Sequence, residues 1–245
     1  MALKRRMILA LTVSDGKLVR SKHFRADRTY SLDFVDLEGA DELVVLDITP
    51  EPDATSTTRF IEVVERLSGD LFLPLAVGGH VRTWDYAREL MNAGADKIVV
   101  GHHALNDVMF IERLVGKLGS SSVVAGVEAH PPERRPPNYD GLSFSMCGEI
   151  LSQTFSRDGS LQGYDVDFIR ELAALFNKPI IAMSGCGVPG HMIDAFNAGA
   201  SACATSNIFH FTRKHVAMFK RKIAEAGIPM RPMVEDHFGP PRACR

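Results

Sequence analysis

The chain has 245 residues, of which 45% are hydrophobic, with 28 basic and 30 acidic side chains and a formal net charge of −2. A chain so close to neutral has no overall field to attract a phosphate backbone or an anionic membrane, so we expect neither nucleic acid nor a membrane as a partner. A length near 250 residues suits one α/β barrel domain. We expect this domain over residues 1–231 and a short C-terminal tail over 232–245.

The cysteines and the start of the chain indicate the compartment. Cys147, Cys186, Cys203 and Cys244 are far apart and have no C-x-x-C spacing, which predicts neither a zinc site nor a redox motif. So few cysteines in a chain of this length indicate reduced thiols and a cytoplasmic protein. We also expect the protein to use no metal and no cofactor. The apolar run 7–11 is too short for a membrane span and predicts a buried strand.

Short apolar runs rich in β-branched residues alternate along the chain with longer stretches of helical period. Runs that are apolar on both faces and separated by helices are typical of a parallel sheet covered by helices. The expected strands are 7–13, 43–47, 73–77, 98–100, 123–128, 150–154, 179–183 and 202–205. The expected helices are 58–67, 83–93, 107–118, 166–176, 191–198 and 213–226.

An internal repeat favours a closed barrel. Pro74 and Gly94 recur 105 residues later as Pro179 and Gly199, each in a similar local sequence. A constant offset near half the chain predicts two related half-barrels and hence a TIM barrel of eight βα units. The alternative, an open doubly wound sheet, leaves the repeat unexplained.

One βα unit departs from this pattern. The segment 131–137 reads Pro-Pro-Glu-Arg-Arg-Pro-Pro, which cannot be helical, and little chain remains before the sixth strand. We therefore expect the outer helix between strands five and six to be reduced or missing.

Several segments resemble one family. Residues 41–49, 77–82, 94–97, 156–165 and 208–211 are similar to the cyclase subunit of imidazole glycerol phosphate synthase, the HisF family of histidine biosynthesis, and the resemblance runs from Lys4 to about Arg231. It implies a barrel that receives ammonia from a separate glutaminase subunit. It also implies a bis-phosphorylated ribulosyl substrate at the C-terminal face, where two aspartates act as acid and base.

This sequence differs from the family at the two catalytic positions. The matching residues are Thr12 and Glu128. A threonine hydroxyl does not ionise near neutral pH, and the glutamate carboxylate extends one methylene further. Asp158 is the best remaining carboxylate on this face, although it is equally compatible with a turn before Gly159.

The family's phosphate-binding turns are altered as well. His80 replaces a glycine after strand three, His102 and His103 follow Gly101 after strand four, and the turns after strands seven and eight contain Cys186 and Ser206. Such changes imply a different ligand or none. A metal site formed by the histidines is the less favoured interpretation, and Asp47 either orients a ligand or caps its own turn. The expected ligand-binding residues are Asp47, Gly79, His80, Gly101, His102, Gly159, Gly185, Ser206 and Asn207.

The opposite face of the predicted barrel keeps the family's residues. A ring of one arginine, one lysine and two glutamates controls ammonia entry in that family, and Arg6, Glu42, Lys97 and Glu149 occupy the matching positions. Asp96 matches a position that faces the glutaminase. Each residue alone is also compatible with an ordinary solvated strand start, but four matching identities favour a gate and a docking site for a HisH-like glutaminase at this N-terminal face.

Three functions remain open from sequence alone. The first is a diverged barrel that pairs with a glutaminase and conducts ammonia to another acceptor, either a compound or a second enzyme. The second is a genuine cyclase that uses Glu128 and Asp158. The third is a non-catalytic assembly subunit. Fold analogy cannot choose among the three, because the fold alone does not determine function.

Overall fold

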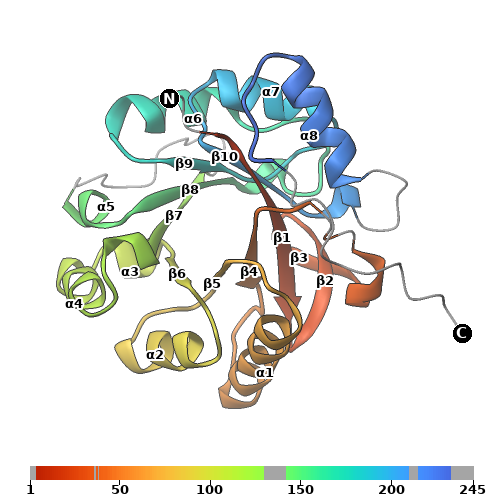
Figure 1. The fold of residues 1–245 in the computed structure, drawn as a ribbon. Coiled ribbons are helices and arrows are strands. Elements are labelled where there is room, and N and C mark those ends of the chain that lie inside the picture. Colours follow the sequence, from red (N-terminus) through yellow and green to blue (C-terminus); the bar gives the residue numbers. More distant parts are fainter. Residues whose placement is uncertain (1–3, 36, 38, 130–141, 210–214, 233–245) are drawn as a thin grey trace, which may run out of the picture.

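The computed structural model describes residues 4–35, 37, 39–129, 142–209 and 215–232, which form a closed barrel of parallel strands surrounded by helices (Figure 1). The last barrel strand pairs with the first, so the sheet has no open edge between them. This closure confirms the TIM barrel and excludes the open doubly wound sheet. The barrel strands are β1 (Arg6–Ser14), β4 (Glu42–Asp47), β5 (Leu75–Gly78), β6 (Lys97–Val100), β7 (Val123–Ala129), β8 (Glu149–Thr154), β9 (Ile180–Ala182) and β10 (Ala202–Thr205).

The helices lie outside the strands, as Figure 1 shows. Several begin at the capping residue that the sequence offers; Asp53, Asp107 and Asp165 each accept a hydrogen bond from a backbone N–H three residues later. The helices are α1 (Ala54–Asp70), α2 (Trp84–Asn92), α3 (His102–Leu105), α4 (Val108–Leu118), α5 (Leu142–Met146), α6 (Val166–Leu175), α7 (Pro189–Asn197) and α8 (Val216–Glu225). No helix in this described part of the chain is long and apolar enough to cross a membrane.

Alternation along the strands separates two apolar cores. On β1, Met7, Leu9 and Leu11 pack with helix residues, whereas Ile8 and Ala10 belong to a smaller cluster built from strand residues and Met183. Successive strand side chains point to opposite faces, so the smaller cluster fills the barrel interior. The interior is therefore a packed apolar core with two polar ends.

The internal repeat has a structural counterpart. Helix α7 has the same length as α2 and lies 105 residues later, and β10 stands in the same relation to β6. Gly94 and Gly199, which end the two helices, have φ angles of 104° and 113°. The half-barrel symmetry predicted from sequence is present in the backbone.

A β-hairpin after β1 was not predicted. Its strands, β2 (Lys17–Lys22) and β3 (Arg25–Thr29), are antiparallel, and β2 pairs with the end of β1. Every residue of β3 is exposed. A strand without apolar alternation has no periodic signal, so the sequence predicts no strand over residues 25–29.

Two predictions fall largely outside the described residues. Between β7 and β8 the structure describes only the short helix α5, and the proline-rich segment lies within the undescribed residues 130–141. Of the expected tail, only Pro232 is described. The domain boundary near residue 231 therefore stays a prediction.

Candidate functional site

The two ends of the barrel carry different polar groups. At the N-terminal end, Arg6, Glu42, Lys97 and Glu149 come from β1, β4, β6 and β8 and meet in one set of contacts, here called the N-terminal ring. The Arg6 guanidinium donates to Glu42 Oε1 at 2.8 Å and to Glu149 Oε1. Lys97 Nζ lies 2.7 Å from Glu149 Oε2 and 3.5 Å from Glu42 Oε2. The structure thus brings together all four residues grouped by sequence.

Arg6, Glu42 and Glu149 of the N-terminal ring are buried and Lys97 is partly buried, and the ion pairs stabilise the charges of Arg6 and Glu149. Burial alone opposes ionisation of Glu149, but attraction to Arg6 and the contacts with Lys97 outweigh burial and lower the pKa of this carboxyl. For Arg6, burial likewise favours the neutral form, and the two glutamates outweigh it and raise the pKa. The ion pairs therefore favour the charged forms of both Arg6 and Glu149.

The lowered pKa of Glu149 predicts a pH dependence of stability. A carboxyl whose pKa is lower when folded contributes stability above its unfolded pKa, and the contribution is lost as the pH falls through the folded value. We expect the difference in unfolding free energy between the wild type and Glu149→Gln to be largest near pH 7 and to shrink below the ordinary pKa of 4.5. Denaturant unfolding at a series of pH values measures it. A difference that is constant from pH 7 to pH 3 would contradict an ionised, paired Glu149.

Asp96 lies at the same end and is exposed. Its Oδ2 accepts a hydrogen bond of 2.8 Å from the backbone N–H of Leu75, at the start of β5. In the same way, Asp41 Oδ2 accepts a hydrogen bond from the backbone N–H of Met7, and Asp41 Oδ1 accepts one from Lys220 Nζ. Asp96 thus has a structural contact within the chain, and one side of its carboxylate remains available at the surface.

At the C-terminal end, Thr12 occupies a position from which it cannot act on a ligand. The residue is 1% exposed, and its hydroxyl donates a hydrogen bond of 2.6 Å to the backbone carbonyl of Val19 in the hairpin. Thr12 lines neither of the two cavities found at this end. Its role in the structure is to attach the hairpin to the barrel.

Asp158 also holds the hairpin. Its Oδ1 accepts from Ser21 Oγ at 3.1 Å, and its Oδ2 accepts from the N–H of Phe24 at 2.9 Å. Burial raises the pKa of Asp158, and this effect outweighs the two hydrogen bonds, which lower the pKa. His23 adds contacts to Phe155, with the rings 5.6 Å apart. We call Asp158 with Ser21 and Phe24 the hairpin clamp.

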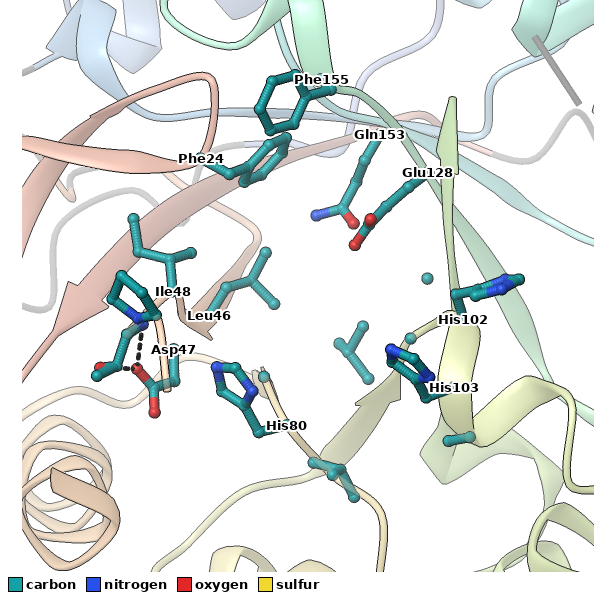
Figure 2. A pocket seen from close by; sticks show the side chains of 18 of the residues that line it. Phe24, Leu46, Asp47, Ile48, His80, His102, His103, Glu128, Gln153 and Phe155 are labelled. Carbon is teal, nitrogen blue, oxygen red and sulfur yellow. Dashed lines mark hydrogen bonds between the residues drawn. The ribbon is translucent and has the colours of Figure 1, made fainter. Parts of the chain in front are cut away.

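The larger cavity has a volume of about 690 Å³ and opens between the hairpin tip and the ends of β4 to β8. The Glu128 side chain is exposed to it and lies next to Gln153, and Figure 2 shows the carboxylate pointing into the space. Phe24 and Phe155 form an aromatic wall at its upper edge. A cavity of this size is typical of a site for a small molecule.

Histidines line the opposite side of this main cavity. Figure 2 shows the rings of His80 and His103 pointing into the space, whereas that of His102 points away. His102 Nε2 lies 3.2 Å from Asn106 Nδ2. His103, which was not among the expected ligand-binding residues, therefore has the better position for a ligand than His102.

The remaining predicted ligand residues divide between two cavities. Asp47, Gly79 and Gly101 line the main cavity. Asp47 Oδ1 accepts a hydrogen bond of 2.9 Å from the backbone N–H of Thr49 and so caps its own turn. A second cavity of only about 20 Å³ is lined by Asp158, Gly159, Gly185 and Ser206, among others. The side chain of Asn207 lies outside the described part. Within the described ranges, no three His, Cys, Asp or Glu side chains are placed to hold a metal ion.

Sequence reasoning missed several lining residues. Phe24 and His23 lie in the hairpin turn between β2 and β3, a segment for which the sequence predicts no strands. Gln153 had a usable signal, because it lies two and four residues beyond Leu151 and Glu149 on β8 and therefore on the same inward face.

Comparisons with known proteins agree with this architecture. The family model described as "Histidine biosynthesis protein" matches residues 6–135 and 140–214. A curated protein from Pyrococcus furiosus, imidazole glycerol phosphate synthase subunit HisF, is 31% identical over 251 residues, covering 94% of this chain and 99% of that protein.

Proposed function

Because this chain belongs to the HisF family of histidine biosynthesis proteins, we propose that it is the barrel subunit of a glutamine amidotransferase complex, related in function to imidazole glycerol phosphate synthase. In this proposal a HisH-like glutaminase docks on the N-terminal face and releases ammonia there. The barrel then conducts ammonia to the C-terminal face, where the acceptor is not the usual ribulosyl substrate.

The N-terminal ring is the observation that carries the proposal. A buried set of ion pairs is a weak source of stability compared with apolar side chains of similar size. Four charges from four strands at the barrel entrance therefore call for another explanation, and controlled entry of a small polar molecule supplies one. Above the ring lies the apolar interior, with Ile8, Val44 and Leu151 among its residues, which suits uncharged ammonia better than ammonium.

Docking at this face is supported by its surface. Phe72, in the loop before β5, is 88% exposed, the most exposed large hydrophobic residue described. It lies on the same barrel end as Asp96, which is tied to the start of β5. Aromatic side chains are enriched at protein–protein interfaces relative to the rest of the surface, so Phe72 is a candidate contact for a partner.

The experiment is a binding titration with a HisH-type glutaminase, with glutamate release measured in parallel. We expect micromolar or tighter binding, weakened at least about tenfold by Phe72→Ala or Asp96→Arg. Asp96→Asn keeps an acceptor for the Leu75 N–H and serves as the structural control. Absence of binding at micromolar concentration, or unchanged binding by Asp96→Arg and Phe72→Ala, would overturn the docking proposal.

A second variant tests conduction rather than docking. Lys97→Ala removes one cation of the N-terminal ring and leaves Glu149 paired with Arg6 alone. We expect docking to persist while the ratio of ammonia delivered to glutamate released changes. An unchanged ratio would assign the ring a purely structural role.

The changed acceptor is supported at the other end. Thr12 donates its hydroxyl to Val19, and Glu128 and Asp158 line different cavities. A genuine cyclase that uses Glu128 and Asp158 is the second candidate, favoured by family membership. A non-catalytic assembly subunit is the third, and the size of the main cavity disfavours it.

A further inference from the structure

We propose that the barrel mouth binds a sugar-sized ligand with a single anionic group, held between His80 and His103, and that the hairpin closes the place where a second anionic group would bind. The inference deepens the proposed function, since it names the class of compound at the face where ammonia would arrive. It depends on the asymmetry of the mouth rather than on docking.

The two halves of the mouth have the same backbone but different space. The turn after β5 contains Gly79 and His80, with φ angles of 108° and 55°, and the turn after β9 contains Ser184 and Gly185, with 81° and 97°. The positions correspond at the 105-residue offset of the repeat. Yet the first turn borders a cavity of about 690 Å³, whereas the second turn borders a cavity of about 20 Å³. The smaller cavity has room for about one water molecule.

The hairpin accounts for the closed half. Asp158 holds Ser21 and Phe24, and Gly159 lies so close that a Cβ there would be 2.9 Å from the Ser21 carbonyl oxygen. A Cβ on Gly185 would lie 2.3 Å from the Gly163 carbonyl. A phosphate or carboxylate group has no space here unless the hairpin clamp opens.

The open half has groups that suit one anion. His80 adopts a left-handed conformation that costs a non-glycine residue roughly 1 kcal/mol, at a position where the repeat has Gly185. Backbone strain of this kind is common at ligand-binding sites, although Ser184 in the corresponding turn also has a positive φ angle. Within the described chain neither His80 nor His103 has a hydrogen bond that would hold its ring away from a ligand, and Arg82 lies on the same rim.

The rest of the cavity suits an uncharged polar body. Phe24 and Phe155 offer flat apolar faces, against which a sugar ring packs, and Glu128 and Gln153 offer hydrogen-bonding groups at the barrel axis. Glu128 also repels an anion, so the anionic group belongs at the histidine side.

The test uses the isolated chain, so a failure of glutaminase docking does not affect it. Histidine side-chain NMR signals are followed during titration with glucose 6-phosphate, glucuronate, fructose 1,6-bisphosphate and neutral glucose, up to about 20 mM. We expect at least one of the first two to shift the His80 and His103 signals, and their comparison distinguishes a phosphate from a carboxylate. Glucose should bind at least about tenfold more weakly than the better anion.

Variants check the residues. His80→Ala and His103→Ala should each weaken binding about tenfold, whereas the matched control His102→Ala should change it less than about twofold. Thermal melting confirms that each variant is folded. The proposal is overturned if neither anion shifts the two signals, if His102→Ala weakens binding as much as His103→Ala, or if the bisphosphate binds about tenfold more tightly and Ser184→Ala removes the gain.

Discussion

Replacing Arg6 by alanine is expected to lower the free energy of unfolding by about 3 kcal/mol, because breaking a buried ion pair leaves its partners uncompensated. The side chains of Arg6, Glu42 and Glu149 are 9%, 8% and 10% exposed, so their charges are largely shielded from water. Lys97 would remain 2.7 Å from Glu149, whereas Glu42 would keep only Lys97 at 3.5 Å and the half-exposed Arg231 at 3.6 Å. Glu42 therefore loses its shortest ion pair, the one with Arg6. Urea unfolding measures the resulting change in the free energy of unfolding.

Arg170→Ala is the matched control. Its ion pair with Asp167 is 2.8 Å long, similar to the Arg6–Glu42 distance, but both side chains are more than 60% exposed. Exposed pairs contribute about 0–1 kcal/mol, so this variant should unfold almost as the wild type does. Equal effects of Arg6→Ala and Arg170→Ala would show that the N-terminal ring is solvated in solution.

Most of the fold follows from patterns that a sequence displays. The barrel strands appeared as apolar runs, and Glu149 was placed at a strand start because the buried run 150–154 follows it. The four ring residues are grouped by the resemblance to the HisF family, and their positions at strand starts agree with this grouping because the strand starts of a parallel barrel share one end. The repeat predicts that the barrel is closed, since it relates the strands β5 and β6 of one half-barrel to β9 and β10 of the other.

The candidate site was predicted less completely, for a physical reason. Its shape depends on the hairpin, whose second strand is wholly exposed and whose contacts join Ser21 to Asp158 across 137 residues. No local pattern encodes such a contact. Ring directions are equally hidden, since His102 and His103 are neighbours on α3 and only the fold shows which one faces the cavity.

Supplied with ammonium salt, the purified chain is expected to turn over the bis-phosphorylated ribulosyl substrate at least about 100-fold more slowly than the Pyrococcus furiosus relative assayed alongside. An acid–base pair contributes about 10²- to 10⁴-fold, and the hydroxyl of Thr12 is both non-ionising and committed to Val19. Spectrophotometric assay of substrate consumption measures the rate. Turnover within about 100-fold of the relative would instead favour the genuine cyclase.

Restoring the two aspartates is not expected to restore that activity. In Thr12→Asp with Glu128→Asp, the new carboxylate at position 12 would face the Val19 carbonyl oxygen, which now lies 2.6 Å from the Thr12 hydroxyl, at a site that is 1% exposed. Two acceptors at that distance repel each other, so the variant should lose stability, whereas Thr12→Val should only lose the hydrogen bond. The closed half of the mouth would still exclude the second phosphate. Full rescue by the double variant would show that the hairpin opens readily and that the two side chains alone separate this chain from a cyclase.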